Sequence, residues 1–201
     1  MRFLPADQPI ATCVATSCDG CPLQDRVHCH FTQRDLTSFL LSVAPSFILA
    51  GLGLILFNPW LLIPWLVFIP TFFGIIEIRV LCAHCPHYAE PGKALQCWAN
   101  YGSPRLWKFR PGPLALWEKI VLFGGFVIIW GGPMLIMALS GQWLLAGLTA
   151  IATAGFFYRL QIRNCNQCFN FACPLNRVDE ATRRAFLERN PVLKSNFGER
   201  R

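Results

Sequence analysis

Four long apolar runs constrain this chain more than any other feature of its sequence. An α-helix rises about 1.5 Å per residue, so about 20 residues cross the roughly 30 Å hydrocarbon core of a bilayer. The runs are continuous rather than alternating, which excludes membrane β-strands. The chain is therefore predicted to be an all-α membrane protein. Its four transmembrane helices are expected at Leu36–Phe57, Trp60–Val80, Trp117–Leu139 and Trp143–Ile162.

The composition agrees with membrane insertion. Of 201 residues, 54% are hydrophobic and only 14% are charged, which is too apolar for a soluble domain of this length. A buried core helix would explain one such run, but four runs with almost no charges favour the membrane. The first 35 residues have no apolar core of a secretory signal, so we expect them to be retained.

The connections between the runs predict two tight transmembrane hairpins, 36–80 and 117–162. Residues 58–59 join the first pair of helices and residues 140–142 join the second pair, and neither turn carries Lys or Arg. The 18 Lys and Arg residues lie instead in the other segments or at the helix ends facing them. The positive-inside rule then predicts that both termini are cytoplasmic (N-in/C-in), in an inner (cytoplasmic) membrane.

Three segments remain outside the hairpins, and together they contain every cysteine. We name them the arm (1–35), the middle loop (81–116) and the tail (163–201). The cytoplasm is reducing, so thiols placed there are more often metal ligands than disulfides. We expect a metal-bound cytoplasmic lid held by ten cysteines: Cys13, Cys18, Cys21, Cys29, Cys82, Cys85, Cys97, Cys165, Cys168 and Cys173.

The arm cysteines form a C-x4-C-x2-C-x7-C pattern. In its first three positions this spacing resembles plant-type ferredoxin ligation, although the final gap is shorter. Four thiolates this close in sequence can surround one tetrahedral metal or one cubic cluster. Gly20 gives the turn between the second and third cysteines conformational freedom.

A second site must be assembled from both halves of the chain. Cys82 and Cys85 make one C-x-x-C pair, and Cys165 and Cys168 make another. These four cysteines are the symmetric ligand set. The three tail cysteines with one from the middle loop are nearly as good a set, and either set would link the two hairpins.

Iron–sulfur clusters fit this ligand supply better than zinc does. Three cysteines directly precede proline, as in ferredoxin-type runs, and ten cysteines stand against four histidines. We therefore expect two [4Fe–4S] clusters. Zinc is the alternative, because histidines lie beside the cysteines. These histidines are His28, His30, His84 and His87.

Four further residues are candidates for contact with a membrane quinone. Glu77 and Arg79 are ionisable residues at the inner end of the second helix, where such groups are commonly functional. Trp98 and Arg105 belong to the aromatic and basic middle loop, which could line the mouth of a quinone site. The tail contains VDEATRRAFLERN, predicted as a short amphipathic helix capped by Asp179.

In general plan the chain is similar to membrane polyferredoxin-type subunits, which carry Cys-Pro motifs at the cytoplasmic ends of membrane helices. The resemblance implies electron transfer between a soluble redox protein, or a larger membrane complex, and the quinone pool. We expect an electron-transfer subunit rather than a stand-alone enzyme, with no nucleic-acid partner. The alternative is a zinc-stabilised membrane scaffold or assembly protein without redox activity.

Overall fold

The computed structural model of this chain describes residues 7–197, and these residues are all-helical without a β-strand. A single antiparallel bridge joins Ala94 to Pro104 within the middle loop. Residues 1–6 of the arm and 198–201 of the tail lie outside the described residues.

Four helices are long and apolar enough to cross a membrane, as predicted: Gln33–Phe57, Pro59–His84, Leu116–Leu139 and Trp143–Cys165. The second and fourth extend past their predicted ends into the C-x-x-C motifs, to His84 and Cys165. The first helix is α1. Local changes of helix type divide the other three spans into shorter elements. The second span consists of η1 (Pro59–Leu61), α2 (Leu62–Thr71), η2 (Phe72–Ile76), α3 (Glu77–Val80) and η3 (Cys82–His84). The third consists of α4 (Leu116–Phe126), η5 (Val127–Gly131) and α5 (Gly132–Leu139), and the fourth of α6 (Trp143–Leu160) and η6 (Gln161–Cys165).

The outer surface of these helices is strongly apolar. Leu139 and Leu144 are about four-fifths exposed, at 80% and 79%, and Ile151 is 71% exposed. Large exposed apolar surfaces are rare on soluble monomers and mark membrane or protein contacts. A lipid environment is the natural partner for this surface.

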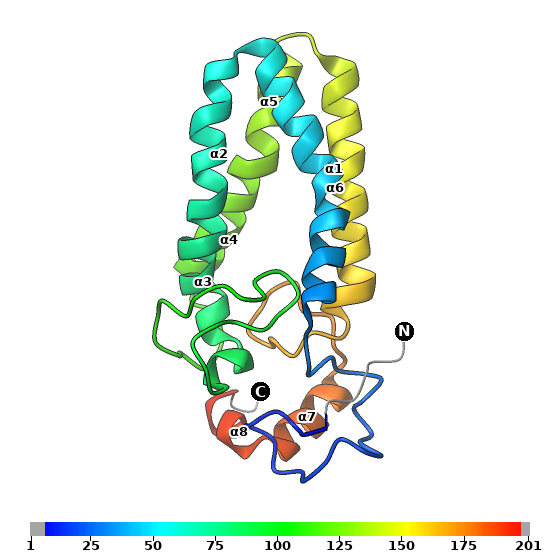
Figure 1. Ribbon diagram of the computed structural model, residues 1–201. Helices are drawn as coiled ribbons and strands as arrows, with labels where there is room; N and C mark the ends of the chain where they lie inside the picture. The colour runs from blue at the N-terminus through cyan, green and yellow to red at the C-terminus, as the bar shows by residue number, and fades with distance from the viewer. Residues whose placement is uncertain (1–6, 198–201) are drawn as a thin grey trace.

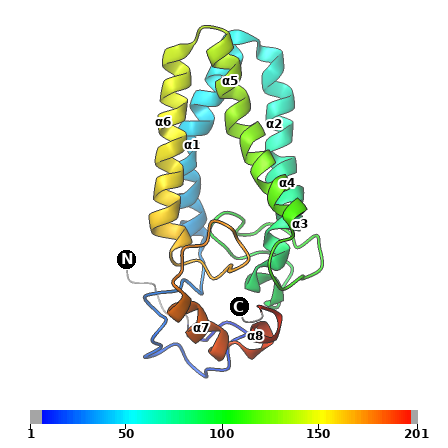
Figure 2. The ribbon, with the colours of Figure 1, turned by 180° about the vertical axis from the view of Figure 1, so that it is seen from behind.

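The helices pack unevenly along their length. α1 lies along α6 and also contacts α5, while α3 packs against α4. Figures 1 and 2 both show α1 and α6 diverging from α2 and α4 toward the end that carries the middle loop. Within the α2 and α4 side, the second and third spans meet closely at Gly125 of α4, since a Cβ there would lie 1.8 Å from Cε2 of Phe72.

Two indole hydrogen bonds hold the helices together deep in the bundle. Pro133 has no N–H to donate to the carbonyl of Ile129 one turn earlier. The indole N–H of Trp65 donates to that carbonyl instead, at 2.9 Å. The indole N–H of Trp130 donates to Oγ of Ser46 at 3.1 Å. Both bonds satisfy polar groups that have no water available at this depth.

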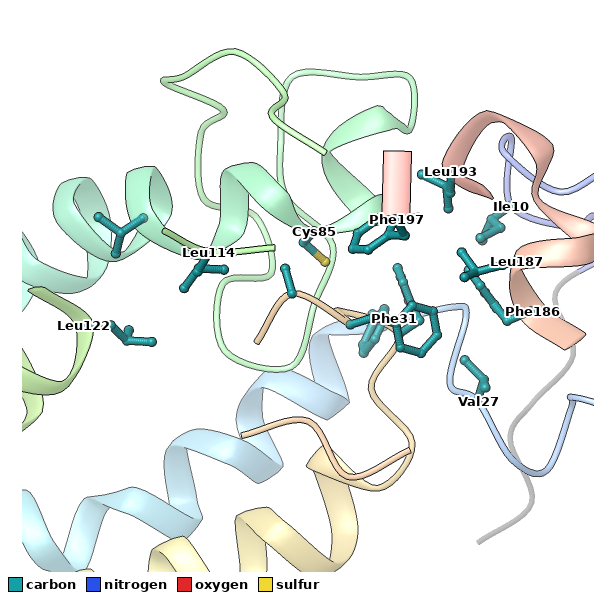
Figure 3. Close-up of a cluster of buried hydrophobic side chains, with 14 of the residues drawn as sticks. Ile10, Val27, Phe31, Cys85, Leu114, Leu122, Phe186, Leu187, Leu193 and Phe197 are labelled. Atoms are coloured by element: carbon teal, nitrogen blue, oxygen red, sulfur yellow. The ribbon is translucent and has the colours of Figure 1, made fainter. Parts of the chain in front are cut away.

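The arm, the middle loop and the tail form one apolar cluster at the wider end of the bundle. Figure 3 shows Phe31 of the arm, Cys85 of the middle loop and Phe186 of the tail among its members. The tail adds α7 (Glu180–Arg189) and α8 (Pro191–Phe197), and the middle loop adds η4 (Pro86–Ala89). The predicted cap of α7 is confirmed, because Oδ1 of Asp179 accepts from the backbone N–H of Thr182 at 2.9 Å.

Candidate thiol-lined cofactor sites

All ten cysteines lie in the segments gathered at one end of the helices, which we call the thiol end (Figure 1). All ten are free thiols, and none is fully exposed. Three are buried, namely Cys82, Cys85 and Cys165, and the other seven are partly buried. Exposed thiols at this density would be prone to oxidation, so their burial keeps these cysteines available as ligands.

The four arm cysteines surround one small pocket, which we call the arm pocket. It has a volume of about 60 Å³ and is also lined by His30 and Arg189. The turn between Cys18 and Cys21 is closed by a backbone hydrogen bond of 3.1 Å, and Gly20 within it has a φ of 68°. Only a residue without a side chain adopts this left-handed conformation readily. The local sequence therefore brings these thiols together.

Two basic side chains reach the arm thiols. Nη1 of Arg189, at the end of α7, donates to Sγ of Cys21 at 3.7 Å. Nε2 of His30 lies 3.8 Å from Sγ of Cys18. Burial, and then the nearby charges of Cys21 and Cys18, raise the pKa of the Cys29 thiol to about 12. Thiols this close resist ionising together, and a bound cation removes that resistance.

The other six cysteines line a second and much larger space, the thiol cavity, of about 560 Å³. Three come from the segment after α3 and three from the segment after α6. The six are Cys82, Cys85, Cys97, Cys165, Cys168 and Cys173. The cavity therefore unites both halves of the chain around one group of sulfurs, as the paired C-x-x-C motifs suggested.

Asn100 organises the thiols that come from the middle loop. Its side-chain N–H groups donate to Sγ of Cys82 at 3.4 Å and to Oε2 of Glu77 at 2.9 Å. Its backbone N–H donates to Sγ of Cys97 at 3.2 Å. On the tail side, Nε2 of Gln161 donates to Sγ of Cys165 at 3.7 Å. Donors directed at sulfur suit anionic thiolate ligands.

The electrostatics of the thiol cavity cross from one half of the chain to the other. Burial and then the charges of Cys97 and Cys173 raise the pKa of the Cys85 thiol. Burial and then Cys85 and Cys173 raise the pKa of Cys168. Thiols of the middle loop and of the tail thus raise the pKa of the same side chain, Cys85, so the two groups of sulfurs lie close enough to interact.

Neither site has the compact arrangement of a site for a single ion. Among residues 7–197, no three His, Cys, Asp or Glu side chains are grouped so that they could hold a metal ion. A tetrahedral zinc site needs sulfurs about 2.3 Å from the ion, and therefore about 3.8 Å from one another. Any group held by these thiols would have to be larger than one ion, or would have to draw them inward.

Stacked aromatic rings connect the arm pocket to the thiol cavity. His28 precedes Cys29 in the chain, Trp98 follows Cys97, and their ring centroids are 4.4 Å apart in a stacked arrangement. Phe31 contacts His87 with centroids 4.9 Å apart. Burial lowers the pKa of His87 to about 3, so this ring is neutral at physiological pH.

The four residues predicted to contact a quinone separate into two groups. Glu77 and Trp98 line the thiol cavity. Arg79 lies elsewhere, with Nη1 3.8 Å from Oε1 of Glu118 and its guanidinium 5.7 Å from the ring centre of Trp107. Arg105 donates to the backbone carbonyls of Tyr88, Glu90 and Ala94, so it holds the middle loop together.

The sequence did not point to Glu118, which anchors the middle loop to α4. Its side chain is fully buried, at 0% exposed. Its Oε1 accepts from Nη1 of Arg110 at 2.6 Å and lies 3.2 Å from Nε2 of His84. The available signal was its position in the first turn of α4, where its Oε2 accepts from the backbone N–H of Ala115. His84 lies between Cys82 and Cys85, so this network positions the C-x-x-C turn.

No protein-family model, no curated protein and no solved structure matches this chain. The chemistry of the two sites therefore rests on the residues themselves.

Proposed function

We propose that this chain is a membrane electron-transfer protein that binds two [4Fe–4S] clusters at its thiol end. The observation that carries the proposal is that the ten cysteines, from three segments of the chain, line two cavities as a set of four and a set of six. The first cluster takes Cys13, Cys18, Cys21 and Cys29. The second takes four of the six cysteines of the thiol cavity.

The nature of the ligands supports clusters rather than single ions. Both sites supply sulfur in excess of nitrogen, and the thiols lack the close grouping that one tetrahedral ion demands. A cluster of irons and sulfides fills a wider space between its ligands. Within the second site Cys85 is the ligand we place at the centre, because its pKa responds to thiols of both halves.

The aromatic contacts support transfer of electrons between the sites. The stacked pair of His28 and Trp98 joins a neighbour of Cys29 to a neighbour of Cys97. When bound, the clusters would supply one-electron redox chemistry; the protein holds them, excludes water and directs N–H donors at the sulfurs.

We further propose the two-hairpin, N-in/C-in topology in a cytoplasmic membrane. The turns at residues 58–59 and 140–142 contain no Lys or Arg, whereas the Lys and Arg residues of the chain lie toward the thiol end. The thiol end then faces a reducing compartment, where its thiols stay available as ligands. A soluble redox protein or a larger complex would exchange electrons with the arm cluster.

One contact favours a second candidate, a zinc-stabilised scaffold. Nε2 of His30 lies 3.8 Å from Sγ of Cys18, so a histidine could replace one thiol in the arm pocket. Mixed Cys and His ligation is typical of structural zinc sites. Such a site would lock the arm in place without redox activity.

The deciding experiment is analysis of iron, zinc and acid-labile sulfide in protein purified without oxygen, with visible and EPR spectra. We expect about eight irons and eight sulfides per chain, from two clusters of four, and a spectrum that bleaches with dithionite. A colourless protein with stoichiometric zinc and no sulfide would overturn the proposal in favour of the scaffold. A His30→Ala variant sharpens the test, because zinc occupancy would fall while an all-cysteine cluster would persist.

A further inference from the structure

The thiol cavity continues from the cysteines into the membrane-spanning bundle. Its deeper part lies between α1, the second span, the third span and α6, where these helices diverge (Figure 2). Aromatic side chains from all four spans line it. They include Phe39, Phe47, Phe73, Phe126, Trp130 and Phe157. The space thus has an apolar end within the membrane and a polar end at the sulfurs.

Hydrogen-bonding groups without partners lie at the polar end. Nε1 of Trp98 and both ring nitrogens of His87 are buried and have no hydrogen-bond partner among the described residues. The whole His87 residue is only 2% exposed. A buried donor left unpaired costs about 1–3 kcal/mol, so such donors normally serve a ligand. An acceptor-bearing ligand at this position would satisfy them.

We propose that the thiol cavity binds a lipid-soluble quinone beside the cluster, with its ring at Trp98 and His87 and its isoprenoid tail among the aromatic side chains. The ring carbonyls are acceptors that match the N–H groups of Trp98 and His87. The volume of about 560 Å³ is within the usual range of ligand pockets, about 300–1,000 Å³. The tail matches the apolar end, which lies among the membrane-spanning helices.

The lining distinguishes a quinone from a phospholipid. No Lys or Arg of the described chain lines the cavity, and one of its polar members is the acidic Glu77. A phosphate headgroup would need a positive partner there. A neutral quinone ring needs only hydrogen-bond donors, which the cavity supplies.

The redox role of this quinone site rests on the proposed function. Conversion of one bound quinone to one quinol would take two electrons and two protons. The electrons would come one at a time from a soluble reduced carrier, by way of the cluster that the cavity cysteines would hold, and the protons would come from water. No bond in the protein forms or breaks.

The test is equilibrium binding of quinone to the oxidised protein in nanodiscs, which requires no electron transfer. A short-tailed benzoquinone and a short-tailed naphthoquinone serve as probes, and an azido-quinone maps the site by photolabelling. Ala44→Phe places a ring in the cavity, since Ala44 lines it. Ala150→Phe adds the same ring to the exposed face of α6 and is the matched control.

We expect saturable binding by the parent protein and by Ala150→Phe, a loss of about tenfold or more in Ala44→Phe, and labelled peptides from the cavity lining. Trp98→Phe, which keeps the aromatic ring but removes its N–H, should weaken binding several-fold even if Ala44→Phe fails to fold. Equal binding by all variants, labelling outside the cavity, or no saturable binding would overturn the inference. Iron and sulfide content tests the clusters separately, so cluster-containing protein that binds no quinone refutes only this inference.

Discussion

The arm pocket and the thiol cavity present the same ligand chemistry but are built in opposite ways. The arm pocket takes its four cysteines from positions 13 to 29, and a turn at Gly20 brings them together. The thiol cavity takes six cysteines from positions 82–97 and 165–173, which only the packing of four helices brings together. Local chain geometry suffices for the first site, whereas the second depends on the whole fold. Removing one cysteine ligand should therefore disturb only the arm in the first site, but the packing of both halves of the chain in the second.

The largest expected difference is between Cys85→Ser and Cys21→Ser. Each variant should lose about half of the iron and sulfide, since one of two clusters is lost. Only Cys85→Ser should also lower the unfolding temperature strongly, because its cluster links the two halves and metal binding contributes directly to folding. Metal and sulfide analysis combined with thermal unfolding followed by circular dichroism measures both effects. An equal fall in unfolding temperature would contradict the distinction between a local and a global site.

A smaller effect is expected from Glu118→Gln, which removes the buried charge that positions His84 beside the cavity thiols. We expect a loss of about 2–3 kcal/mol in the free energy of unfolding, because charged buried hydrogen bonds are lost. The matched control is Glu188→Gln on α7, whose side chain is exposed, so the change should stay within about 0.5 kcal/mol. Unfolding in mixed micelles compares the variants. A Glu118→Gln protein as stable as the control would show that the network does not support the cavity.

Asn100→Ala tests the sulfur hydrogen bond in the thiol cavity without removing a ligand. The Asn100 side chain donates to Sγ of Cys82, and a donor at sulfur stabilises the more negative reduced cluster. The reduction potential of the cavity cluster should fall by about 40 mV, which is about 1 kcal/mol for a one-electron couple. An EPR-monitored redox titration reads both clusters in one sample, so the arm cluster is the internal control. A shift in the reduction potential of the arm cluster alone would contradict our assignment of Asn100 to the cavity cluster.

The smallest effect is expected from Arg189→Gln, the corresponding change at the arm pocket. Removing a positive charge 3.7 Å from Sγ of Cys21 should lower the potential of the arm cluster by about 10–20 mV, because solvent screens this partly exposed group. The control is Arg184→Gln on the same helix, whose side chain pairs with Glu180. The same titration measures both variants. A larger shift in the cavity cluster than in the arm cluster would contradict the separation of the two sites.

Much of the fold follows from patterns that act over short distances. The four spans were predicted to within a few residues at most ends, because about 20 continuous apolar residues have few alternatives to a membrane helix. The grouping of the four arm cysteines could also be read from their spacing, and they do line one pocket. By contrast, nothing local marked Asn100, since an isolated amide looks the same whether it faces solvent or a buried thiol. Glu118 had only its position in the first turn of α4 as a local signal, and that position does not reveal its contact with His84.

The sequence by itself determined the four helices, the side of the bundle on which every thiol lies, and the grouping of the arm cysteines. These properties depend on hydrophobicity, charge and chain reach over a few residues. Only the tertiary structure decided that cysteines of both halves line one cavity and that this cavity continues among aromatic side chains. It also decided that Trp98 and His87 have buried nitrogens without a hydrogen-bond partner among the described residues. Those properties arise where helices diverge, and divergence is set by which side chains meet across segments far apart in the chain.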